Sequence, residues 1–452
     1  MAGIYKAYDV RGTYPDQINE DISRQIGLAY RNVLTENDLA RSNQVVVSRD
    51  MRSHSLPIQA ALIEGLLASG LDVLDIGLAT TPMNYFAIGS TGAAGGIQVT
   101  ASHNPARYNG LKFSRRGARP VSGDHGIPLM EAKVAAGDLP VVDQPGALTE
   151  GDIYDAYGKH ILSYLHLDDD SPALKVAIDA ANGMGTIYQP LLEKMGFELV
   201  PLYFELDGTF PNHEANPLKY ENLRDLGELV RSSAADFGIS FDGDADRAAF
   251  VDETGEPIGS DLMTALIGGE LLGRESGKHV LFDLRSSRAV PEYITECGGI
   301  PVRERVGHSF VKATLREKEG IFGGELAGHY YFRDNYYADC ALLAVVEVLN
   351  LLRAKGGTMS ELVAPLMRYA KSQEINFEVE DKQGKMDEIG ERFSDGEIDY
   401  LDGITVQYPD WWFNVRPSNT EPYLRLVLEA KDEQQLAERQ AEMIEILGTP
   451  AE

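Results

Sequence analysis

Alternating strand and helix patterns, repeated three times along the chain, limit the possible folds more than any other feature of the sequence. The first round contains the buried strand pattern VVVSRD at 45–50, followed by the helix pattern SLPIQAALIEGLLASG that ends at Gly70. The pattern restarts with KVAIDAANGMG after about residue 150, and a third round begins near residue 255. Strands that alternate with helices form largely parallel sheets covered by helices. The sequence therefore predicts three similar α/β domains with mixed, largely parallel sheets.

The C-terminal part of the chain follows a different order. From about residue 368 the patterns are a strand, a short helix, two strands and a last helix, which predicts a smaller α+β domain. A chain of 452 residues is too long for one ordinary domain and is expected to form roughly three or four. The predicted domains are domain I (1–150), domain II (151–254), domain III (255–364) and domain IV (365–452).

Composition excludes several classes of partner. A net charge of -29 argues against nucleic acid, because phosphate backbones require a basic surface. The most apolar helix pattern, ALLAVVEVLNLL, carries Glu347 and Asn350 and is too polar and too short to span a membrane. The N-terminal residues lack the apolar core of a signal peptide, and Cys297 and Cys340 have neither disulfide-framework nor zinc-site spacing. We expect a cytoplasmic protein with no membrane partner.

The segment TASHNP at 100–105 places Ser102 at the end of an apolar alternating run. A serine-hydrolase nucleophile elbow requires GxSxG, and Ser102 lacks these glycines, so that type of nucleophile is excluded. Neighbouring side chains on an extended segment point to opposite faces, so we expect His103 to be badly placed as a base for Ser102. A serine in a turn that begins at Asn-Pro is the alternative interpretation.

The segment FDGDADRAAF at 241–250 contains three alternating carboxylates, Asp242, Asp244 and Asp246. Alternate residues of an extended segment share one face, and three converging carboxylates repel one another unless a hard cation such as Mg²⁺ neutralises them. A calcium EF-hand is excluded because Arg247 stands where that loop needs glycine. An acidic turn without metal is the alternative.

The segment GGELAGHYYF at 323–332 surrounds Glu325 and His329 with glycines. This pattern predicts a carboxylate and an imidazole exposed on a flexible loop, where they are suited to bind sugar hydroxyls or to move protons. Taken alone, the motif favours the alternative of a structural loop.

The segment VRPSNTEPYLRL at 415–426 gathers two guanidinium groups and three short polar side chains around one predicted turn. These groups are suitable donors for a phosphate dianion. A tight turn rich in turn-forming residues is the alternative. We call this set the phosphate clamp, and its members are Arg416, Ser418, Asn419, Thr420 and Arg425.

The four motifs together resemble those of the α-D-phosphohexomutase family. TASHNP, DGDADR, GELAGH and RPSNTEP occur in that order over nearly the whole chain, and YDVRG near the start and VGHSFVK at 306–312 match as well. The resemblance implies four domains around one central cleft. It also implies an isomerase that reversibly transfers a phosphoryl group between the 1- and 6-positions of hexose phosphates, through a phosphoserine and a hexose 1,6-bisphosphate. Phosphoglucosamine mutase and a metal-dependent sugar phosphatase are the rival activities.

The resemblance assigns a role to each motif. Ser102 would carry the phosphoryl group, and Mg²⁺ would be held by Asp242, Asp244 and Asp246 together with an oxygen on Ser102. Lys112 and Arg247 would supply positive charge during transfer. The candidate catalytic residues are Ser102, His103, Lys112 as general base, Arg247 and His329. The candidate substrate contacts are Tyr8, Arg11, Arg285, His308, Glu325, Leu326, Ala327, Gly328 and the phosphate clamp.

Substrate choice is predicted from the residue after Glu325. Relatives with methionine there, in GEMSGH, act on mannose and glucose phosphates, whereas phosphoglucosamine mutases have glutamine. Leu326 is apolar and similar in volume to methionine, so the resemblance favours mannose and glucose phosphates. Ala327 replaces the usual serine, and Arg285 stands where several relatives have lysine. We expect a small sugar phosphate as the partner and a monomer or weak homo-oligomer.

Overall fold

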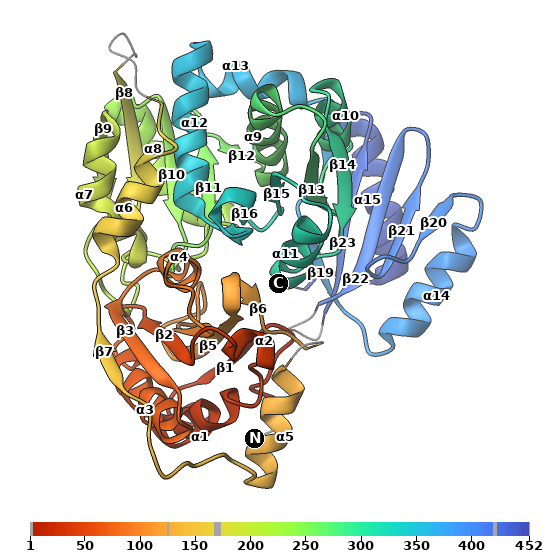
Figure 1. The fold of residues 1–452 in the computed structure, drawn as a ribbon. Coiled ribbons are helices and arrows are strands. Elements are labelled where there is room, and N and C mark those ends of the chain that lie inside the picture. Colours follow the sequence, from red (N-terminus) through yellow and green to blue (C-terminus); the bar gives the residue numbers. More distant parts are fainter. Residues whose placement is uncertain (1–2, 124–125, 167–172, 419–422, 452) are drawn as a thin grey trace.

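The computed structural model describes residues 3–123, 126–166, 173–418 and 423–451 (Figure 1). Its strands form four sheets that follow one another along the chain. We refer to the units around these sheets as domains I to IV. The first three are α/β units and the fourth is a smaller C-terminal unit, so the predicted fold class is confirmed.

The sheet of domain I has seven strands. They are β1 (Asp9–Thr13), β2 (Gln44–Arg49), β3 (Asp72–Leu78), β4 (Gly95–Val99), β5 (Tyr108–Arg115), β6 (Arg119–Pro120) and β7 (Leu148–Glu150). Strand β2 is parallel to β3 and β4, whereas β5 is antiparallel to β4 and β1. The helices are α1 (Glu20–Tyr30), α2 (Glu36–Leu39), α3 (Ser55–Ala68), α4 (Thr81–Thr91) and α5 (Ile127–Ala136).

Domain II has a five-stranded sheet. Its strands are β8 (Leu174–Asp179), β9 (Phe197–Leu202), β10 (Phe237–Phe241), β11 (Ala248–Val251) and β12 (Pro257–Ile258). Since β12 pairs with β11, this sheet continues past residue 254. Its helices are α6 (Tyr154–Leu162), α7 (Gln189–Leu192) and α8 (Arg224–Ser233).

Domain III also has a five-stranded sheet. Its strands are β13 (His279–Asp283), β14 (Ile300–Glu304), β15 (Phe322–Gly324), β16 (Tyr330–Phe332) and β17 (Ala338–Asp339). The helices are α9 (Ser260–Arg274), α10 (Ala289–Glu296), α11 (His308–Glu317), α12 (Ala341–Lys355) and α13 (Met359–Val363). Short 3₁₀ helices connect elements in all three α/β domains, namely η1 (Arg116–Ala118), η2 (Met184–Tyr188), η3 (Glu193–Met195), η4 (Tyr220–Leu223), η5 (Arg333–Asn335) and η6 (Ala364–Leu366).

The three α/β sheets share one strand order. The spatial orders are β3-β2-β4-β5, β9-β8-β10-β11 and β14-β13-β15-β16. When these strands are counted in chain order, the first lies between the second and the third, and the fourth is antiparallel to the third. Strands β4 and β10 are buried at every position, as expected for strands covered on both faces. The connection from the third to the fourth strand therefore occupies an equivalent place in each domain.

Helix α12 is an apolar helix that contains two buried polar side chains, each with a bonding partner. All its residues from Ala341 to Leu352 are buried, Glu347 and Asn350 included. Glu347 pairs with Arg274 at 2.8 Å, and the amide of Asn350 bonds the backbone of Tyr164 and His166. The helix is thus a buried core element, and among the residues described no helix has the length and apolarity to cross a membrane.

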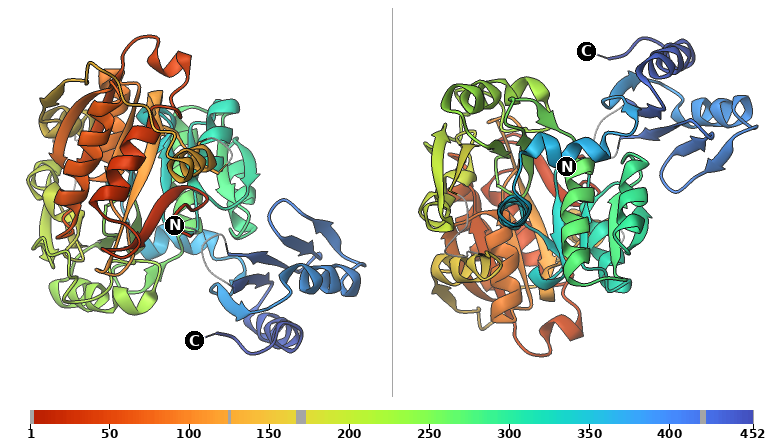
Figure 2. Two further views of the ribbon diagram at one scale, coloured as in Figure 1. Left: turned by 90° about the horizontal axis from the view of Figure 1, so that it is seen from below. Right: turned by 90° about the horizontal axis from the view of Figure 1, so that it is seen from above.

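Domain IV has an antiparallel sheet and its own core. The strands are β18 (Ala370–Lys371), β19 (Ile375–Glu378), β20 (Glu397–Asp399), β21 (Ile404–Gln407), β22 (Trp411–Pro417) and β23 (Tyr423–Ala430), and the helices are α14 (Lys382–Arg392) and α15 (Glu433–Leu447). Side chains such as Phe377, Phe413 and Leu428 form a cluster separate from those of the other domains. Figure 2 shows this domain projecting from the rest of the molecule.

Candidate active site

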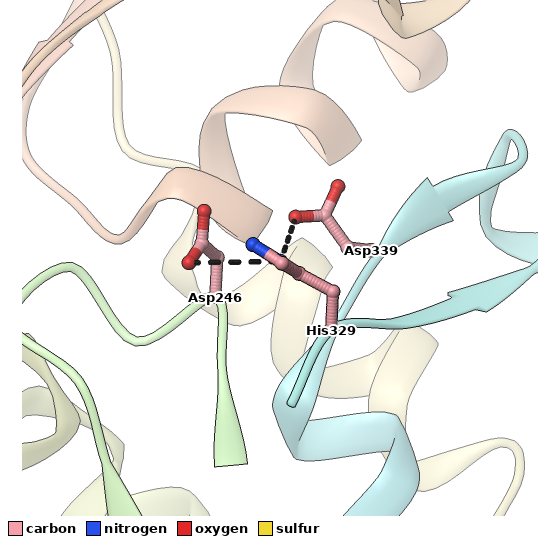
Figure 3. Close-up of side chains that lie close together, drawn as sticks. All are labelled: Asp246, His329 and Asp339. Atoms are coloured by element: carbon pink, nitrogen blue, oxygen red, sulfur yellow. Dashed lines mark hydrogen bonds and ion pairs between the residues drawn. The ribbon is translucent and has the colours of Figure 1, made fainter. Parts of the chain in front are cut away.

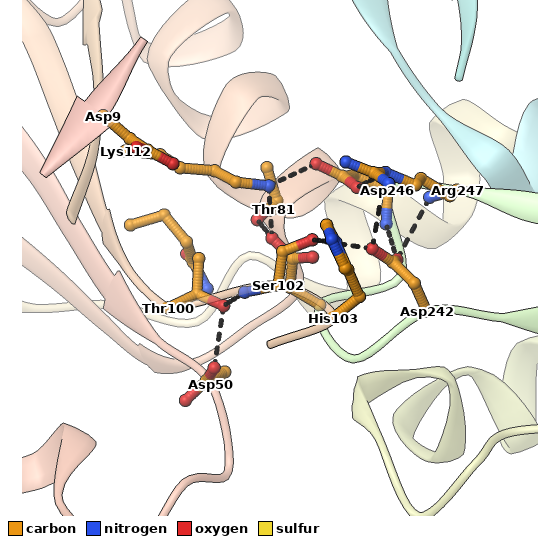
Figure 4. Close-up of polar contacts among 12 residues, drawn as sticks. Asp9, Asp50, Thr81, Thr100, Ser102, His103, Lys112, Asp242, Asp246 and Arg247 are labelled. Atoms are coloured by element: carbon orange, nitrogen blue, oxygen red, sulfur yellow. Dashed lines mark hydrogen bonds and ion pairs between the residues drawn. The ribbon is translucent and has the colours of Figure 1, made fainter. Parts of the chain in front are cut away.

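Loops from three domains meet at the predicted site, and each is the connection after the third parallel strand of its sheet. Ser102 follows β4, residues 242–247 follow β10, and residues 325–329 follow β15. Ser102 Oγ donates a hydrogen bond of 2.8 Å to Asp242 Oδ2 (Figure 4). Arg247 forms a β-bridge with His329, and its Nε donates to His329 Nε2 at 3.0 Å. The repeated topology therefore brings three of the predicted motifs into direct contact.

Ser102 lies on a turn that is fixed by a buried arginine. Its φ of 51° is in the left-handed region, which a residue with a side chain occupies only when its surroundings hold it there. Arg52, 2% exposed, donates to the carbonyl oxygens of Ser102 and Asn104 at 2.8 and 2.6 Å. Asp50 accepts from Arg52 Nε at 3.2 Å and holds the guanidinium in place. The serine hydroxyl is therefore presented by a rigid loop.

The expectation that His103 points away from Ser102 is wrong. Ser102 Oγ and His103 Nδ1 are 3.2 Å apart, within hydrogen-bond distance. The prediction assumed an extended segment, whereas the left-handed φ at Ser102 turns the chain and brings the two side chains to one side. Burial, together with the nearby Arg247 and Arg11, lowers the pKa of His103 well below its usual value. A neutral imidazole therefore stands beside the hydroxyl.

Gly243 allows the Ser102 loop and the acidic loop to approach each other. A Cβ atom at this position would lie 2.3 Å from the carbonyl oxygen of Ser102, which is much closer than two such atoms can pack. The contact between Ser102 and Asp242 thus depends on the missing side chain of the residue between the first two aspartates.

The three aspartates converge, but by a different route from the one predicted. Asp242, Asp244 and Asp246 are each at most 1% exposed, and ligand oxygens from all three lie within 4.8 Å of one another. Residues 242–246 form a turn, with Ala245 at a φ of 58°, instead of an extended segment. Burial and then the charges of Asp246 and Asp244 raise the pKa of Asp242 well above its usual value. Folding has therefore placed three acidic side chains together in a buried site.

The donor set fits a hard divalent cation. Within the described part of the chain, Asp244 Oδ1 and Asp246 Oδ1 are buried and have no hydrogen-bond partner. Two orphaned carboxylate oxygens beside a third carboxylate and a hydroxyl are the oxygen ligands that Mg²⁺ prefers. Leaving such oxygens uncompensated is costly, so the geometry indicates a cation site.

Lys112 is the internal cation of this acidic pocket. It projects from β5, and its Nζ lies 2.6 Å from Asp244 Oδ2 and 2.5 Å from Asp246 Oδ2. Burial alone would lower the pKa of Lys112, but the three aspartates outweigh it and raise this pKa above its usual value. Burial likewise acts to raise the pKa of Asp244, but Lys112, together with a hydrogen bond from Thr81, outweighs burial and lowers it. In this arrangement Lys112 is protonated, so it acts as a charge-neutralising group and a proton donor.

The expectation that Glu325 and His329 are exposed on a flexible loop is wrong. They are 2% and 5% exposed, and the loop is short and flanked by β15 and β16. Glu325 Oε1 accepts from the backbone N–H of Gly307 at 2.9 Å, and Tyr331 donates its hydroxyl to Glu325 Oε2. The glycines serve close packing: a Cβ at Gly324 would lie 2.0 Å from Thr264 Oγ1.

The hydrogen bonds of His329 define its tautomer. Arg247 Nε donates to His329 Nε2, so that nitrogen is an acceptor and the proton is on Nδ1. Nδ1 donates to Asp339 Oδ2 at 3.0 Å and lies 3.9 Å from Asp246 Oδ1 (Figure 3). Lys312, also buried, pairs with Asp339 Oδ1 at 2.5 Å. His329 is therefore a neutral imidazole oriented by a lysine–aspartate pair.

The described part of the phosphate clamp is built across two strands. Arg416 on β22 and Arg425 on β23 are directly opposite in the antiparallel register. Each donates to a different oxygen of Glu374, Arg416 Nη2 to Oε2 and Arg425 Nη1 to Oε1, both at 2.8 Å. The backbone N–H of Ser418 bonds the carbonyl oxygen of Tyr423 at 2.9 Å. Asn419 and Thr420 lie outside the described residues.

Arg285 connects the loop at 325–329 to the phosphate clamp. Its Nε and Nη2 bond the two oxygens of Asp283 at 3.2 and 2.7 Å, and its Nη1 reaches Glu374 Oε2 at 3.3 Å. The same Asp283 accepts from the backbone N–H of Leu326 at 2.7 Å. A lysine has one charged nitrogen and cannot make this forked set of contacts.

Tyr8 and His308 lie at the border between domains I and III, and Arg11 lies within domain I. Tyr8 donates to the carbonyl oxygen of Val306 at 3.2 Å, and its ring packs edge-on against His308 with centroids 5.2 Å apart. Arg11 bonds Asn104 Oδ1 at 2.6 Å, next to the Ser102 loop. Domain I thus contacts domain III directly beside the site.

Comparison with known proteins agrees with this geometry over the whole chain. Four sequence profiles, described as phosphoglucomutase/phosphomannomutase alpha/beta/alpha domains I, II and III and C-terminal domain, match residues 3–138, 155–255, 259–369 and 374–446. A protein of Xanthomonas campestris pv. campestris named "Phosphohexose mutases" is 39% identical over 445 residues, which cover 97% of this chain and 98% of that protein. The chain belongs to the phosphoglucomutase/phosphomannomutase family.

Two further relatives extend the comparison. A phosphomannomutase of Escherichia coli strain K12 is 37% identical over 96% of both chains. An X-ray structure of a phosphoglucomutase/phosphomannomutase family protein from Burkholderia thailandensis superposes with a TM-score of 0.89 at 33% identity, covering 98% of this chain and 96% of that one. The family therefore accounts for the full length of the described fold.

Several residues of this family member that build the site were not singled out from its sequence. They are Arg52, Asp283, Lys312, Asp339 and Glu374. Lys312 ends the VGHSFVK motif, so the motif carried a signal for it. The others act through contacts with residues distant in the sequence, and their local context contains no such signal.

Proposed function

We propose that the protein is a phosphohexomutase that interconverts hexose 1-phosphates and 6-phosphates, with mannose and glucose phosphates as substrates. The observation that carries this proposal is the hydrogen bond of 2.8 Å from Ser102 Oγ to Asp242, at the edge of a buried acidic triad. A hydroxyl placed between a cation site and a neutral imidazole is suited to carry a phosphoryl group, because phosphoryl transfer depends mainly on positioning and charge stabilisation.

In the proposed reaction, phospho-Ser102 gives its phosphoryl group to a sugar hydroxyl. A bond forms between that hydroxyl oxygen and phosphorus, the bond from phosphorus to Ser102 Oγ breaks, and the hydroxyl proton passes to a nearby base. His329 is the candidate for that base, and His103 lies beside Ser102. The resemblance made Lys112 the general base, but its ammonium group is held protonated by Asp244 and Asp246, so it would return a proton instead of accepting one. The resulting hexose 1,6-bisphosphate returns its other phosphoryl group to Ser102. Lys112 and Arg247 hold positive charge at the transfer point.

The residues for the metal and for the sugar are proposed from the same contacts. Asp242, Asp244 and Asp246, with an oxygen on Ser102, would hold Mg²⁺, and the ion supplies positive charge to the phosphoryl oxygens when bound. The sugar hydroxyls would be bound by Glu325 in the loop with Leu326, Ala327 and Gly328. The unreacting phosphate would be held by the phosphate clamp and Arg285.

The experiment that tests the proposal is the intact mass of the purified protein before and after incubation with glucose 1,6-bisphosphate. We expect a gain of one phosphate that maps to Ser102. Replacement Ser102→Ala should lower turnover on the order of a thousandfold or more, because no other group replaces a lost covalent nucleophile. Ser90→Ala, at an exposed position of α4, is the matched control. Near-normal turnover of Ser102→Ala would refute the phosphoserine mechanism.

Rate comparisons separate the rival activities. A phosphatase would release free phosphate from the sugar, whereas a mutase conserves it and is activated by the bisphosphate. A clear preference for glucosamine 1-phosphate over mannose and glucose 1-phosphates would identify a phosphoglucosamine mutase instead. Leu326 supports the preference for mannose and glucose phosphates, because its side chain cannot hydrogen-bond an amino group. The proposal also includes a cytoplasmic location and a monomer or weak homo-oligomer.

A further inference from the structure

Glu374 lies where three arginines from two domains converge. It is located between β18 and β19, and its carboxylate bonds Arg416 and Arg425 of domain IV and Arg285 of domain III. The three contacts measure 2.8, 2.8 and 3.3 Å. Two of these arginines belong to the phosphate clamp. The carboxylate thus lies among the donors that are proposed to hold a substrate phosphate.

Electrostatics explains why a carboxylate is held there. Arg416 and Arg425 are directly opposite on neighbouring strands, an arrangement that is destabilising for like charges. Burial alone would raise the pKa of Glu374, but the charges of Arg285, Arg416 and Arg425 outweigh it and lower the pKa to about 2. Asp283 pairs with Arg285, and Glu374 bonds all three guanidinium groups. A phosphate that binds these groups therefore competes with carboxylates that are already bonded to them.

We propose that Glu374 is an internal counter-ion that competes with the substrate phosphate for Arg285, Arg416 and Arg425, and that it keeps the phosphate affinity of these arginines low enough for release in each cycle. The inference rests on the proposed function, in which the clamp holds the unreacting phosphate. Glu374 weakens phosphate binding whether it moves aside or stays nearby, since a carboxylate and a phosphate dianion repel each other at close range in a partly buried site.

The proposed reaction makes release at the clamp as important as binding. The two phosphoryl groups of the bisphosphate exchange places, so the group on the clamp must leave before the other can enter. Uniformly tight binding of substrate and intermediate does not raise kcat. Separating a phosphate from three poorly solvated guanidinium groups is costly unless another anion neutralises them. The Glu374 carboxylate is already within bonding distance of all three and fulfils this role.

The test is a calorimetric titration of metal-free protein with inorganic phosphate. We expect Glu374→Gln, which keeps the shape and removes the charge, to bind phosphate about tenfold more tightly than wild type, as expected for the removal of one repulsive interaction. Glu64→Gln is the matched control, because Glu64 pairs with Arg24 on the surface of domain I and should leave phosphate affinity unchanged. Unchanged or weaker binding by Glu374→Gln would overturn the proposal and assign Glu374 the role of orienting the arginines.

A second set of variants tests whether the phosphate binds at the arginines. In Arg416→Ala protein, the additional change Glu374→Gln should no longer increase phosphate affinity. An undiminished gain would show that the phosphate binds elsewhere and would also overturn the proposal. Circular dichroism of each variant confirms that it is folded before titration.

Steady-state kinetics test the release step and separate it from the proposed function. Glu374→Gln should lower both KM and kcat for glucose 1-phosphate, because the ligand is held more tightly at every stage. An unchanged kcat would exclude the role in release. If wild type itself shows no mutase activity, the proposed function fails, whereas the phosphate titrations still decide whether Glu374 competes with anions.

Discussion

The acidic pocket and the phosphate clamp are opposite in charge and alike in construction. In the acidic pocket, the ammonium group of Lys112 pairs with two of three clustered, buried carboxylates. At the clamp, its two arginines and the neighbouring Arg285 surround the carboxylate of Glu374. In each region the internal counter-ion has the same sign of charge as the ligand proposed for that region. This ligand is a cation in the acidic pocket and an anion in the clamp.

An internal counter-ion explains how each of these charged clusters is stable in the folded protein. An uncompensated buried charge costs several kcal/mol, roughly 3–5 kcal/mol when one partner of a buried pair is removed. An internal counter-ion avoids this cost before the ligand arrives and reduces the net affinity for the ligand afterwards. Fold stability and weak, reversible binding therefore follow from the same side chains.

The largest effect is expected from removing the cation of the acidic pocket. Lys112→Met removes the ammonium group that pairs with two of the three buried carboxylates, Asp244 and Asp246. Without divalent metal, the free energy of unfolding should fall by about 3–5 kcal/mol, and Mg²⁺ should restore part of the loss. Turnover should fall at least about a hundredfold, because a positive group at the transfer point is lost.

Differential scanning calorimetry in EDTA and in Mg²⁺ checks this expectation. Lys355→Met, at the exposed end of α12, is the control and should respond alike in both solutions. Equal destabilisation of Lys112→Met with and without Mg²⁺ would show that the pocket does not bind the ion.

An intermediate effect is expected from the pH dependence of the clamp. The pKa of Glu374 is lowered from 4.5 to about 2 in the folded protein, so its contribution is fully present above about pH 4.5 and is lost as the pH falls toward 2. Its size is about 3 kcal/mol at neutral pH, since each pKa unit corresponds to about 1.4 kcal/mol. The melting temperatures of wild type and Glu374→Gln should differ equally at pH 7 and pH 5 and less at pH 3.5. A difference that widens at pH 3.5 would contradict the assigned ion pairs.

The smallest effect is expected from Arg285→Lys, which keeps the positive charge and removes the forked guanidinium group. Lysine can retain the contact with Asp283 or the contact with Glu374, but it cannot span both as Arg285 does. The KM for glucose 1-phosphate should rise about three- to tenfold with kcat within about twofold, corresponding to the loss of about one hydrogen bond to a charged group. An unchanged KM would show that the link between domains III and IV is not needed for binding.

The sequence was sufficient to predict the fold class and the members of the acidic pocket. Strand and helix periodicity is local, so three α/β units and a different C-terminal unit could be inferred from it. Asp242, Asp244 and Asp246 are close in the chain, and their chemistry alone indicates a cation. The expected geometry was wrong where it depended on backbone angles: Ser102 has a left-handed φ, and the aspartates lie on a turn.

Long-range partners were beyond the reach of the sequence. Glu374 is one of 70 acidic residues, and nothing in its neighbourhood distinguishes it from a solvated surface charge. Its role depends on Arg285, which is 89 positions away. The burial of Glu325 and His329 was missed for a related reason, because glycines that permit tight packing and glycines that permit flexibility look identical in a sequence.

The two tryptophans of the chain, Trp411 and Trp412, are adjacent on β22, so intrinsic fluorescence excited at the indole band arises from domain IV. The indole N–H of Trp412 donates to Glu429 Oε1 at 2.8 Å, and the same oxygen accepts from the backbone N–H of Arg288 in domain III. Separation of the two domains breaks this shared contact and admits water to the indole. Tryptophan fluorescence should therefore report on the contact between domains III and IV. This measurement needs neither a label nor turnover.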